Sequence, residues 1–212
     1  MADHRSFSVE EALAHLRDAD AKLAEVINRV GGYDAPRRSD PYAALVRAIL
    51  FQQLAGAAAN AIQKRFFAIH EPADQPPAPE QLLDTTDDQF RGAGISRQKM
   101  GYLRDLAAHV ADGRLRLNEL PSLSDEEVIE RVTAVKGLGE WSAHMFLMFH
   151  LGRPDVLPIG DLGVRHGMRI TYGLPELPTP KQAIEIGAPW APFRSVGSWY
   201  MWRAGEPVAP DI

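Results

Sequence analysis

The stretch Val135-Lys136-Gly137-Leu138-Gly139-Glu140-Trp141-Ser142-Ala143 decides the fold of this 212-residue chain. An apolar helical run ends there, the chain turns through Gly-Leu-Gly, and a second helix follows. Glycine permits positive φ and leaves backbone amides uncovered. Uncovered amides at the start of a helix attract anions such as phosphate. We therefore expect the amides around Gly137 and Gly139 to bind a phosphate; the alternative is a plain turn between two helices.

Capping signals and helical periodicity extend to both sides of this turn. Ser8 with Glu11 and Ser124 with Glu127 have the spacing of capping boxes. One helical run is expected from Ser8 to the Gly31-Gly32 pair. Other helices are expected behind Asp40-Pro41, at 56–68, behind Ser96, and at 125–134, 139–150, 161–172, 180 onward and 192–203. No strand with alternating polarity is convincing, so the sequence predicts an all-α fold of about nine or ten helices.

Composition narrows the classes of protein that fit. The chain has no Cys, which excludes disulfides, thiolate metal sites and cysteine nucleophiles. No apolar run reaches the roughly 18 residues of a membrane helix, and the polar N-terminus does not resemble a signal peptide. We therefore expect a cytoplasmic protein without membrane contact. The net charge of −5 disfavours a protein that coats DNA, but Arg91–Arg104 carries four bases and no acid, as a local phosphate-binding face requires.

Asp161 is the candidate catalytic carboxylate. It follows Pro158-Ile159-Gly160 and lies twenty positions after Trp141. Aspartate is also a favoured N-cap, and a helix is expected to begin there. The two roles are compatible.

Several segments, in this order, resemble the helix-hairpin-helix (HhH-GPD) DNA glycosylase superfamily and its 3-methyladenine DNA glycosylase II branch. They are Arg47–Leu54, Gly94–Lys99, the hairpin, Leu157–Leu162, Trp190–Ser195 and Trp202. The resemblance implies one two-lobed, all-α domain over 1–212, without the N-terminal β domain of some longer members. One lobe would hold 40–150, with the hairpin at 125–150, and the other 1–39 with 151–212. The active cleft would lie between the lobes, with Asp161 at their junction.

The resemblance also implies a reaction. Bifunctional members carry a lysine after Gly-Leu-Gly-Glu, where this chain has Trp141, and tryptophan forms no Schiff base. A monofunctional glycosylase of base excision repair is expected, without AP lyase activity. It would hydrolyse the N-glycosidic bond of alkylated purines, of the 3-methyladenine and 7-methylguanine class, and leave an abasic site. Asp161 would stabilise positive charge on the deoxyribose or activate the water; both roles stay open.

The implied base pocket is aromatic. Trp141 and Trp202 would form its walls, because an indole face attracts a cationic alkylated purine; the alternative is ordinary core packing. Met145 stands where relatives often carry an aromatic residue, which suggests a broader pocket. Leu162 completes the expected lining.

The implied contacts with DNA begin at Gln52 and Gln53. One of the two would fill the gap left by the flipped nucleotide, and we favour Gln53; the alternative is two glutamines on an exposed helix end. The chain departs from the family pattern with Phe51 before this pair and Ala55 after it. The remaining expected contacts are Lys136, Gly137, Leu138, Gly139 and Arg165.

A monovalent cation, K⁺ or Na⁺, is implied in the hairpin, held by the backbone carbonyls of Thr133, Val135 and Leu138. No other cofactor is expected. The implied partner is damaged double-stranded DNA, bound by a monomer in a bacterial-type cytoplasm near the nucleoid. The alternatives are the same fold acting on uracil, hypoxanthine or ethenoadenine, a non-enzymatic module that binds damaged DNA, and a purely structural helical protein.

Overall fold

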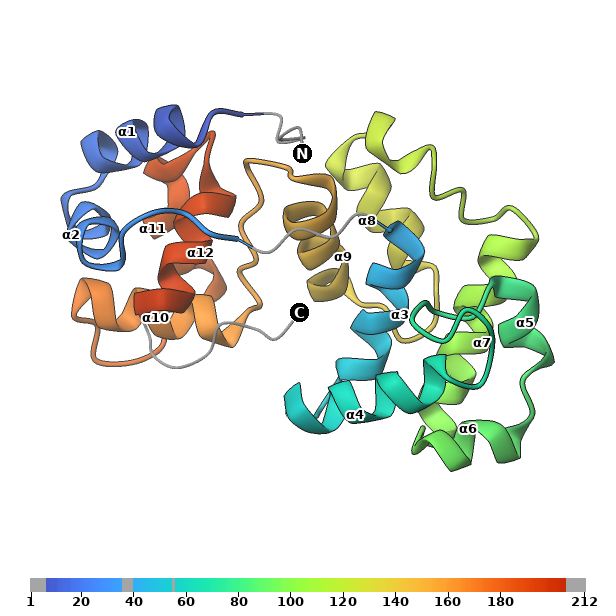
Figure 1. Cartoon of the computed structure of the whole chain (residues 1–212). Coiled ribbons are helices and arrows are strands. Elements are labelled where there is room, and N and C mark those ends of the chain that lie inside the picture. Colours follow the sequence, from blue (N-terminus) through green and yellow to red (C-terminus); the bar gives the residue numbers. More distant parts are fainter. Residues whose placement is uncertain (1–6, 36–39, 55, 205–212) are drawn as a thin grey trace. The chain divides into compact units, whose positions relative to one another are not determined.

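The computed structural model describes residues 7–35, 40–54 and 56–204, and these residues form helices and loops without a strand (Figure 1). Twelve α-helices lie in this described part, where nine or ten were expected. The all-α prediction is confirmed. None of the helices in these ranges is both long and apolar enough to cross a membrane. The described residues divide into two compact units, one made of 7–35 with 147–204 and the other of 40–54 with 56–146.

The unit that contains the hairpin is built around α3 and α7. The apolar face of α3 buries Leu45, Ile49 and Leu50, and α3 packs against α4, α7 and α9. Asp40 caps α3 by accepting from the amides of residues 42 and 43, as the Asp40-Pro41 signal predicts. The helices of this unit are α3 Pro41–Phe51, α4 Gly56–Phe67, α5 Pro79–Asp84, α6 Asp87–Ala93, α7 Arg97–Ala111, η1 Leu120–Ser122, α8 Asp125–Thr133 and α9 Glu140–Phe146.

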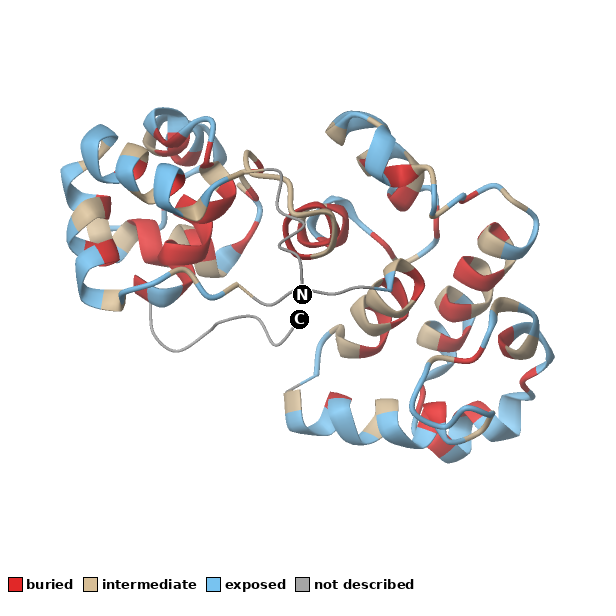
Figure 2. Cartoon of the chain, turned by 45° about the horizontal axis from the view of Figure 1, so that its top comes forward, coloured by how far each residue is buried: buried red, intermediate tan, exposed pale blue. Residues whose placement is uncertain are grey.

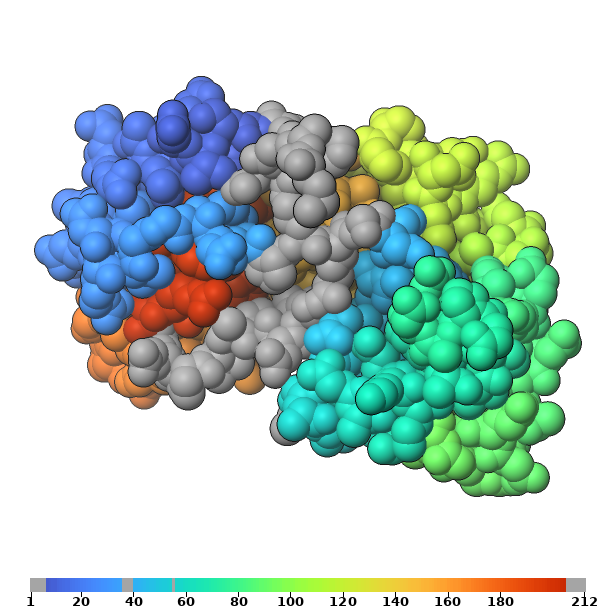
Figure 3. Space-filling model, viewed as in Figure 1, coloured from blue at the N-terminus to red at the C-terminus, as the bar shows by residue number. Residues whose placement is uncertain are grey.

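The other unit is built around α12, which is buried along almost its whole length (Figure 2). On the face drawn in Figure 3, red atoms of α12 are visible beside α2. A Cβ at Gly167 of α10 would lie 2.0 Å from the carbonyl oxygen of Met201, so only glycine allows this close helix crossing. The helices of this unit are α1 Val9–Ala19, α2 Ala21–Val30, the π-helical turn η2 Leu147–Leu151, α10 Leu162–Tyr172, α11 Pro180–Gly187, η3 Ala188–Trp190 and α12 Arg194–Ala204.

The single helical run expected from Ser8 to Gly31-Gly32 is wrong, because the chain breaks at Asp20. Its Oδ1 accepts from the amides of Lys22 and Leu23, each at 3.0 Å, and caps α2. Its Oδ2 accepts from Trp190 Nε1 at 3.0 Å and from the Tyr172 hydroxyl. Burial and the neighbouring carboxylate raise the pKa of Tyr172. Four donors, two of them distant in sequence, therefore hold Asp20 outside a helix.

Other differences from the expected elements are small. The short helices α5 and α6 were not expected, because six or seven residues are too few for a clear period. The last helix begins at Arg194 and not at Pro192. The second helix of the hairpin continues past Phe146 as the π-helical turn η2.

Candidate active site

The hairpin has the predicted helix–turn–helix form. Ser124 and Glu127 form the expected reciprocal capping box at the start of α8. Gly137 lies in the turn with φ +85°, a conformation that favours glycine. The carbonyl of Gly139 then accepts from the amide of Ala143 at 3.1 Å, which starts α9.

Every second amide of the turn is hydrogen-bonded within the protein. The Lys136 N–H donates to Asp105 Oδ2 at 2.8 Å, and the Leu138 N–H donates to the Val135 carbonyl at 3.1 Å. The amides of Gly137 and Gly139 have no acceptor within the described part of the chain. Gly139 also brings no side chain to cap α9. The turn therefore leaves open the two amides that the sequence singled out.

Gly137 is also fixed by its packing against other elements of this unit. A Cβ at this position would lie 2.2 Å from the Tyr102 ring of α7. Its carbonyl accepts from Gln52 Nε2 at 2.7 Å. Nearby, Lys99 donates to the carbonyl of Leu50 in the last turn of α3, and burial lowers the pKa of this ammonium. The end of α3, α7 and the hairpin thus form one bonded assembly.

The two glutamines after α3 differ in their surroundings. Gln52 is bonded to the hairpin, whereas Gln53 is exposed and has φ +57°, the only positive φ of a non-glycine residue among the described residues. A side chain in this conformation carries strain, and such strain often marks a functional position. Ala55 lies outside the described residues.

Asp161 caps α10, as its interpretation as an N-cap residue predicts. The Val164 amide and Trp202 Nε1 each donate to Asp161 Oδ1 at 2.8 Å. The Asp161 amide donates to the Pro158 carbonyl at 2.9 Å. Asp161 is buried, with only 8% of the residue exposed. Its orientation is therefore set by the helix start and by a tryptophan of α12.

Trp202 is buried, and its polar edge faces the carboxylate. The ring also contacts Phe149, with centroids 5.6 Å apart. A Cβ at Gly163 would lie 2.7 Å from Trp202 Cδ1 and 3.1 Å from Asp161 Oδ1, so glycine makes room for the pair. Sequence reasoning missed this bond. The available signal was that the N–H of a buried tryptophan usually finds an acceptor.

Arg194 and Ser195 hold the loop that leads to Asp161. Arg194 Nε and Nη2 donate to the two oxygens of Asp155 at 2.7 and 2.8 Å. This pairing raises the pKa of the guanidinium. Ser195 Oγ donates to the Arg153 carbonyl at 2.7 Å and accepts from the Val156 amide at 2.9 Å. The Ser195 amide also donates to the carbonyl of residue 154, so four consecutive loop residues, 153–156, are bonded to the start of α12.

The remaining predicted residues are divided between the units. Trp141, which is 39% exposed, and the buried Met145 belong to α9 in the hairpin unit. Leu162, which is 66% exposed, and Arg165 belong to α10 in the Asp161 unit. Arg165 Nε donates to the Pro178 carbonyl at 2.7 Å. No group of three His, Asp or Glu side chains in the described ranges is arranged as a metal site.

Comparison with known proteins agrees with this geometry. Residues 46–192 match the family described as HhH-GPD superfamily base excision DNA repair protein. The chain is 37% identical over 204 residues to DNA-3-methyladenine glycosylase 1 of Schizosaccharomyces pombe, covering 94% of this chain and 89% of the relative. It is 28% identical over 210 residues to the putative DNA-3-methyladenine glycosylase YfjP of Bacillus subtilis, covering 95% and 72%.

Solved structures give the same result. The Schizosaccharomyces pombe 3-methyladenine DNA glycosylase Mag1, in complex with abasic DNA, matches with a TM-score of 0.83 and 37% identity, over 91% of this chain and 95% of that chain. A DNA-3-methyladenine glycosidase from Bacillus halodurans matches with a TM-score of 0.80 and 36% identity, over 92% and 89%. The chain belongs to the HhH-GPD superfamily of base excision DNA repair proteins.

Proposed function

We propose that this protein is a monofunctional DNA glycosylase that removes alkylated purines, of the 3-methyladenine and 7-methylguanine class, from duplex DNA. The observation that carries the proposal is Asp161, a buried carboxylate held by two N–H donors at the start of α10. The names of the relatives, among them a 3-methyladenine glycosylase bound to abasic DNA, support this substrate class.

Asp161 supplies the charge that the reaction needs. Cleavage of the N-glycosidic bond builds positive charge on the deoxyribose, as in other glycosyl transfers. A carboxylate already fixed by Val164 and Trp202 does not need to reorient when this charge develops. The same group also orients the water that attacks C1′. The products are the free base and an abasic site.

Trp141 accounts for the absence of strand cleavage. It occupies the position where bifunctional members of the superfamily carry their lysine, and an indole forms no Schiff base. Trp141 is 39% exposed, and its ring is the proposed contact for a flipped base. A cationic alkylated purine gains about 0.5–2 kcal/mol from such a ring. Met145, Leu162 and the ring of Trp202 complete the proposed lining.

The hairpin and Gln53 are the proposed grip on DNA. The open amides of Gly137 and Gly139 bind one phosphate, and Lys136, whose side chain is 78% exposed, adds a positive charge. Gln53 is the proposed wedge, with Gln52 holding the turn beside it. Leu138 and Arg165 are the further proposed contacts.

We also propose that the hairpin holds a monovalent cation. The carbonyls of Thr133 and Leu138 accept no hydrogen bond from the described residues, so their lone pairs remain available. Val135 accepts one bond, from Leu138, and its carbonyl has a second lone pair. K⁺ or Na⁺ on these three oxygens would add positive charge beside the phosphate. We propose that the protein needs no other cofactor and acts as a monomer. We also propose that it acts in a bacterial-type cytoplasm, where the DNA lies.

Excision from methylated duplex DNA by the wild type and by Asp161→Asn tests the proposal. Asparagine keeps an oxygen for Val164 and Trp202 but removes the charge. We expect the single-turnover rate to fall about 10²–10³-fold, the size of a lost electrostatic contact in other enzymes, while DNA binding is retained. Strands should stay intact until alkali is added. Wild-type excision by Asp161→Asn would contradict the mechanism.

A substrate panel separates the rival functions. Release of uracil, hypoxanthine or ethenoadenine, with no release of 3-methyladenine or 7-methylguanine, would assign the fold to another lesion. Binding to abasic DNA without release of any base would identify a damaged-DNA-binding module.

A further inference from the structure

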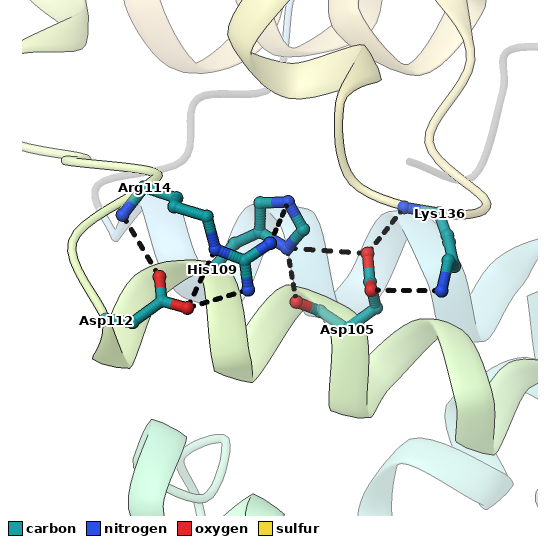
Figure 4. A network of polar contacts seen from close by, with 5 residues as sticks. All are labelled: Asp105, His109, Asp112, Arg114 and Lys136. Atoms are coloured by element: carbon teal, nitrogen blue, oxygen red, sulfur yellow. Dashed lines mark hydrogen bonds and ion pairs between the residues drawn. The ribbon is translucent and has the colours of Figure 1, made fainter.

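A polar network in the hairpin unit runs along α7 and ends at the turn of the hairpin (Figure 4). Asp105 of α7 is the last member before the turn, and its Oδ2 accepts from the Lys136 amide at 2.8 Å. Its Oδ1 lies 3.7 Å from Lys136 Nζ. The carboxylate is only 17% exposed. One side chain therefore contacts both the backbone and the ammonium of the first turn residue.

His109, one helical turn later on α7, is bonded to the backbone of Asp105 and lies beside its carboxylate. Its Nδ1 lies 2.8 Å from the Asp105 carbonyl oxygen and 3.4 Å from Asp105 Oδ2. Its Nε2 lies 3.0 Å from Arg114 Nη1. Arginine is always a donor, so Nε2 accepts and the ring proton is on Nδ1, where it is donated to the Asp105 carbonyl oxygen. Asp112 in turn fixes Arg114 through Nε at 2.7 Å, and this pairing lowers the pKa of Asp112.

A negative charge at Asp105 is unexpected, because this residue lies next to the hairpin turn. A neutral oxygen would satisfy the Lys136 amide, yet a carboxylate stands beside a turn that is proposed to bind a phosphate, where like charges repel. What a carboxylate adds is a shorter and stronger bond to the amide. The carboxylate thus holds the turn firmly, at the cost of a less positive potential beside the proposed phosphate site.

We propose that Asp105 is a positioning residue for the DNA phosphate. By holding the Lys136 amide, Asp105 removes that donor from the DNA face and fixes the turn so that the amides of Gly137 and Gly139 point outward. The His109 ring is fixed by the Asp105 carbonyl and by Arg114, and it packs beside the carboxylate. This inference rests on the proposed function, because it assigns Asp105 to the phosphate contact of that site.

The test compares two replacements at Asp105. Asp105→Asn keeps an acceptor for the Lys136 amide, whereas Asp105→Ala removes it. We expect Asp105→Ala to raise the KM for methylated duplex DNA about tenfold, equal to ~1.4 kcal/mol, with the rate at saturating DNA unchanged. Asp105→Asn should stay within about twofold of the wild type, since the hydrogen bond survives. A purely structural role would instead lower the fraction of active protein and leave KM unchanged.

Amide exchange at Lys136 supplies a readout without any reaction. Nitrogen-15 NMR should show the Lys136 amide protected in the wild type and in Asp105→Asn, and exchanging fast in Asp105→Ala. If Asp105→Ala fails to fold, Asp105→Glu replaces it, because the added methylene displaces the acceptor while keeping the charge; it should raise KM severalfold. Asp88→Asn is the matched control, since Asp88 pairs with Arg91 on α6 and its loss should change neither readout.

Two results would overturn the inference. One is an unchanged KM in Asp105→Ala together with a protected Lys136 amide. The other is an equal rise of KM in Asp105→Ala and Asp105→Asn, which would make the charge and not the hydrogen bond the cause. If the wild type releases no base, the proposed function fails; the affinity of the same variants for abasic duplex DNA, together with the amide exchange, then still decides the role of Asp105.

Discussion

The helices α9 and α10 begin in opposite ways. At α10, Asp161 accepts from the Val164 amide, so the protein's own carboxylate caps the helix. At α9, the position before the helix is Gly139, which has no side chain and whose amide has no acceptor within the described residues. Both helix starts carry the partial positive charge of aligned peptide dipoles. One is closed by an internal anion, and the other is open to an external one.

This difference separates two tasks that a glycosylase must perform. A carboxylate that stabilises charge on a sugar must be held rigidly, and its cap bond together with Trp202 does so. A site for a DNA phosphate must instead keep its donors unpaired until DNA arrives. Under the proposed function, the same helix-terminus chemistry would serve catalysis at α10 and phosphate binding at α9.

Closing the open start of α9 with a carboxylate should have a large effect on DNA affinity. Gly139→Asp would place a carboxylate where α10 has one, and a Cβ at Gly139 meets no atom within 4 Å. We expect the affinity for duplex DNA to fall about 100-fold, because the phosphate loses charge-assisted bonds and meets a like charge. The new cap should raise the free energy of unfolding by about 0.5–1 kcal/mol. Fluorescence anisotropy and urea unfolding measure the two effects.

Gly139→Ala is the control for this change. It adds a Cβ in the same open space but neither a cap nor a charge, so DNA affinity should change less than about threefold. Unchanged affinity in Gly139→Asp would show that the open start of α9 does not bind the phosphate.

Removing one of the bonds that hold Asp161 at the start of α10 should have a smaller effect, which is confined to the excision rate. Trp202→Phe keeps an aromatic ring beside Phe149 but removes the N–H that Asp161 Oδ1 accepts. We expect the single-turnover excision rate to fall about tenfold, as for one hydrogen bond to a charged group. DNA affinity should remain within about twofold, because the hairpin is untouched. Quench-flow measurement of base release gives the rate.

Trp199→Phe is the matched control on the same helix. Trp199 is also buried, and it contacts Tyr33 and Tyr200 edge-on, with no bond to Asp161. Equal losses in the two variants would assign the effect to packing of α12. A loss confined to Trp202→Phe would assign it to the orientation of Asp161.

Sequence alone predicts the parts of this molecule that depend on near neighbours. The cap of Asp161 on α10, the capping box of Ser124 and the Gly-Leu-Gly turn all join residues within a few positions of each other. The bond from Trp202 to Asp161 joins residues 41 positions apart, and that from Lys136 to Asp105 joins residues 31 positions apart. Neither pair shows a spacing that periodicity detects, because only the fold brings the partners together.

Asp20 and the Gln52–Gln53 pair show the same limit. Aspartate inside an apolar helical period is consistent with one continuous helix. The cap of Asp20 on α2 is local, but the bonds from the distant Trp190 and Tyr172 that also hold it cannot be read from the sequence. The two glutamines are identical in type, so the sequence cannot assign their separate surroundings. Their backbone dihedrals and the bond to Gly137 distinguish them.

The smallest expected effect on excision concerns Gln53, whose backbone carries strain because its φ is positive. Glycine adopts φ +57° without the steric cost of a side chain. Gln53→Gly should therefore raise the free energy of unfolding by about 1 kcal/mol, measured by urea unfolding. If Gln53 is the wedge, excision from duplex DNA should fall severalfold, while excision from a substrate with an unpaired lesion should change less, because less stacking must be replaced. Gln53→Ala, which removes the wedge but keeps the strain, should lower excision without the gain in stability. Full activity in both variants would move the wedge to another residue.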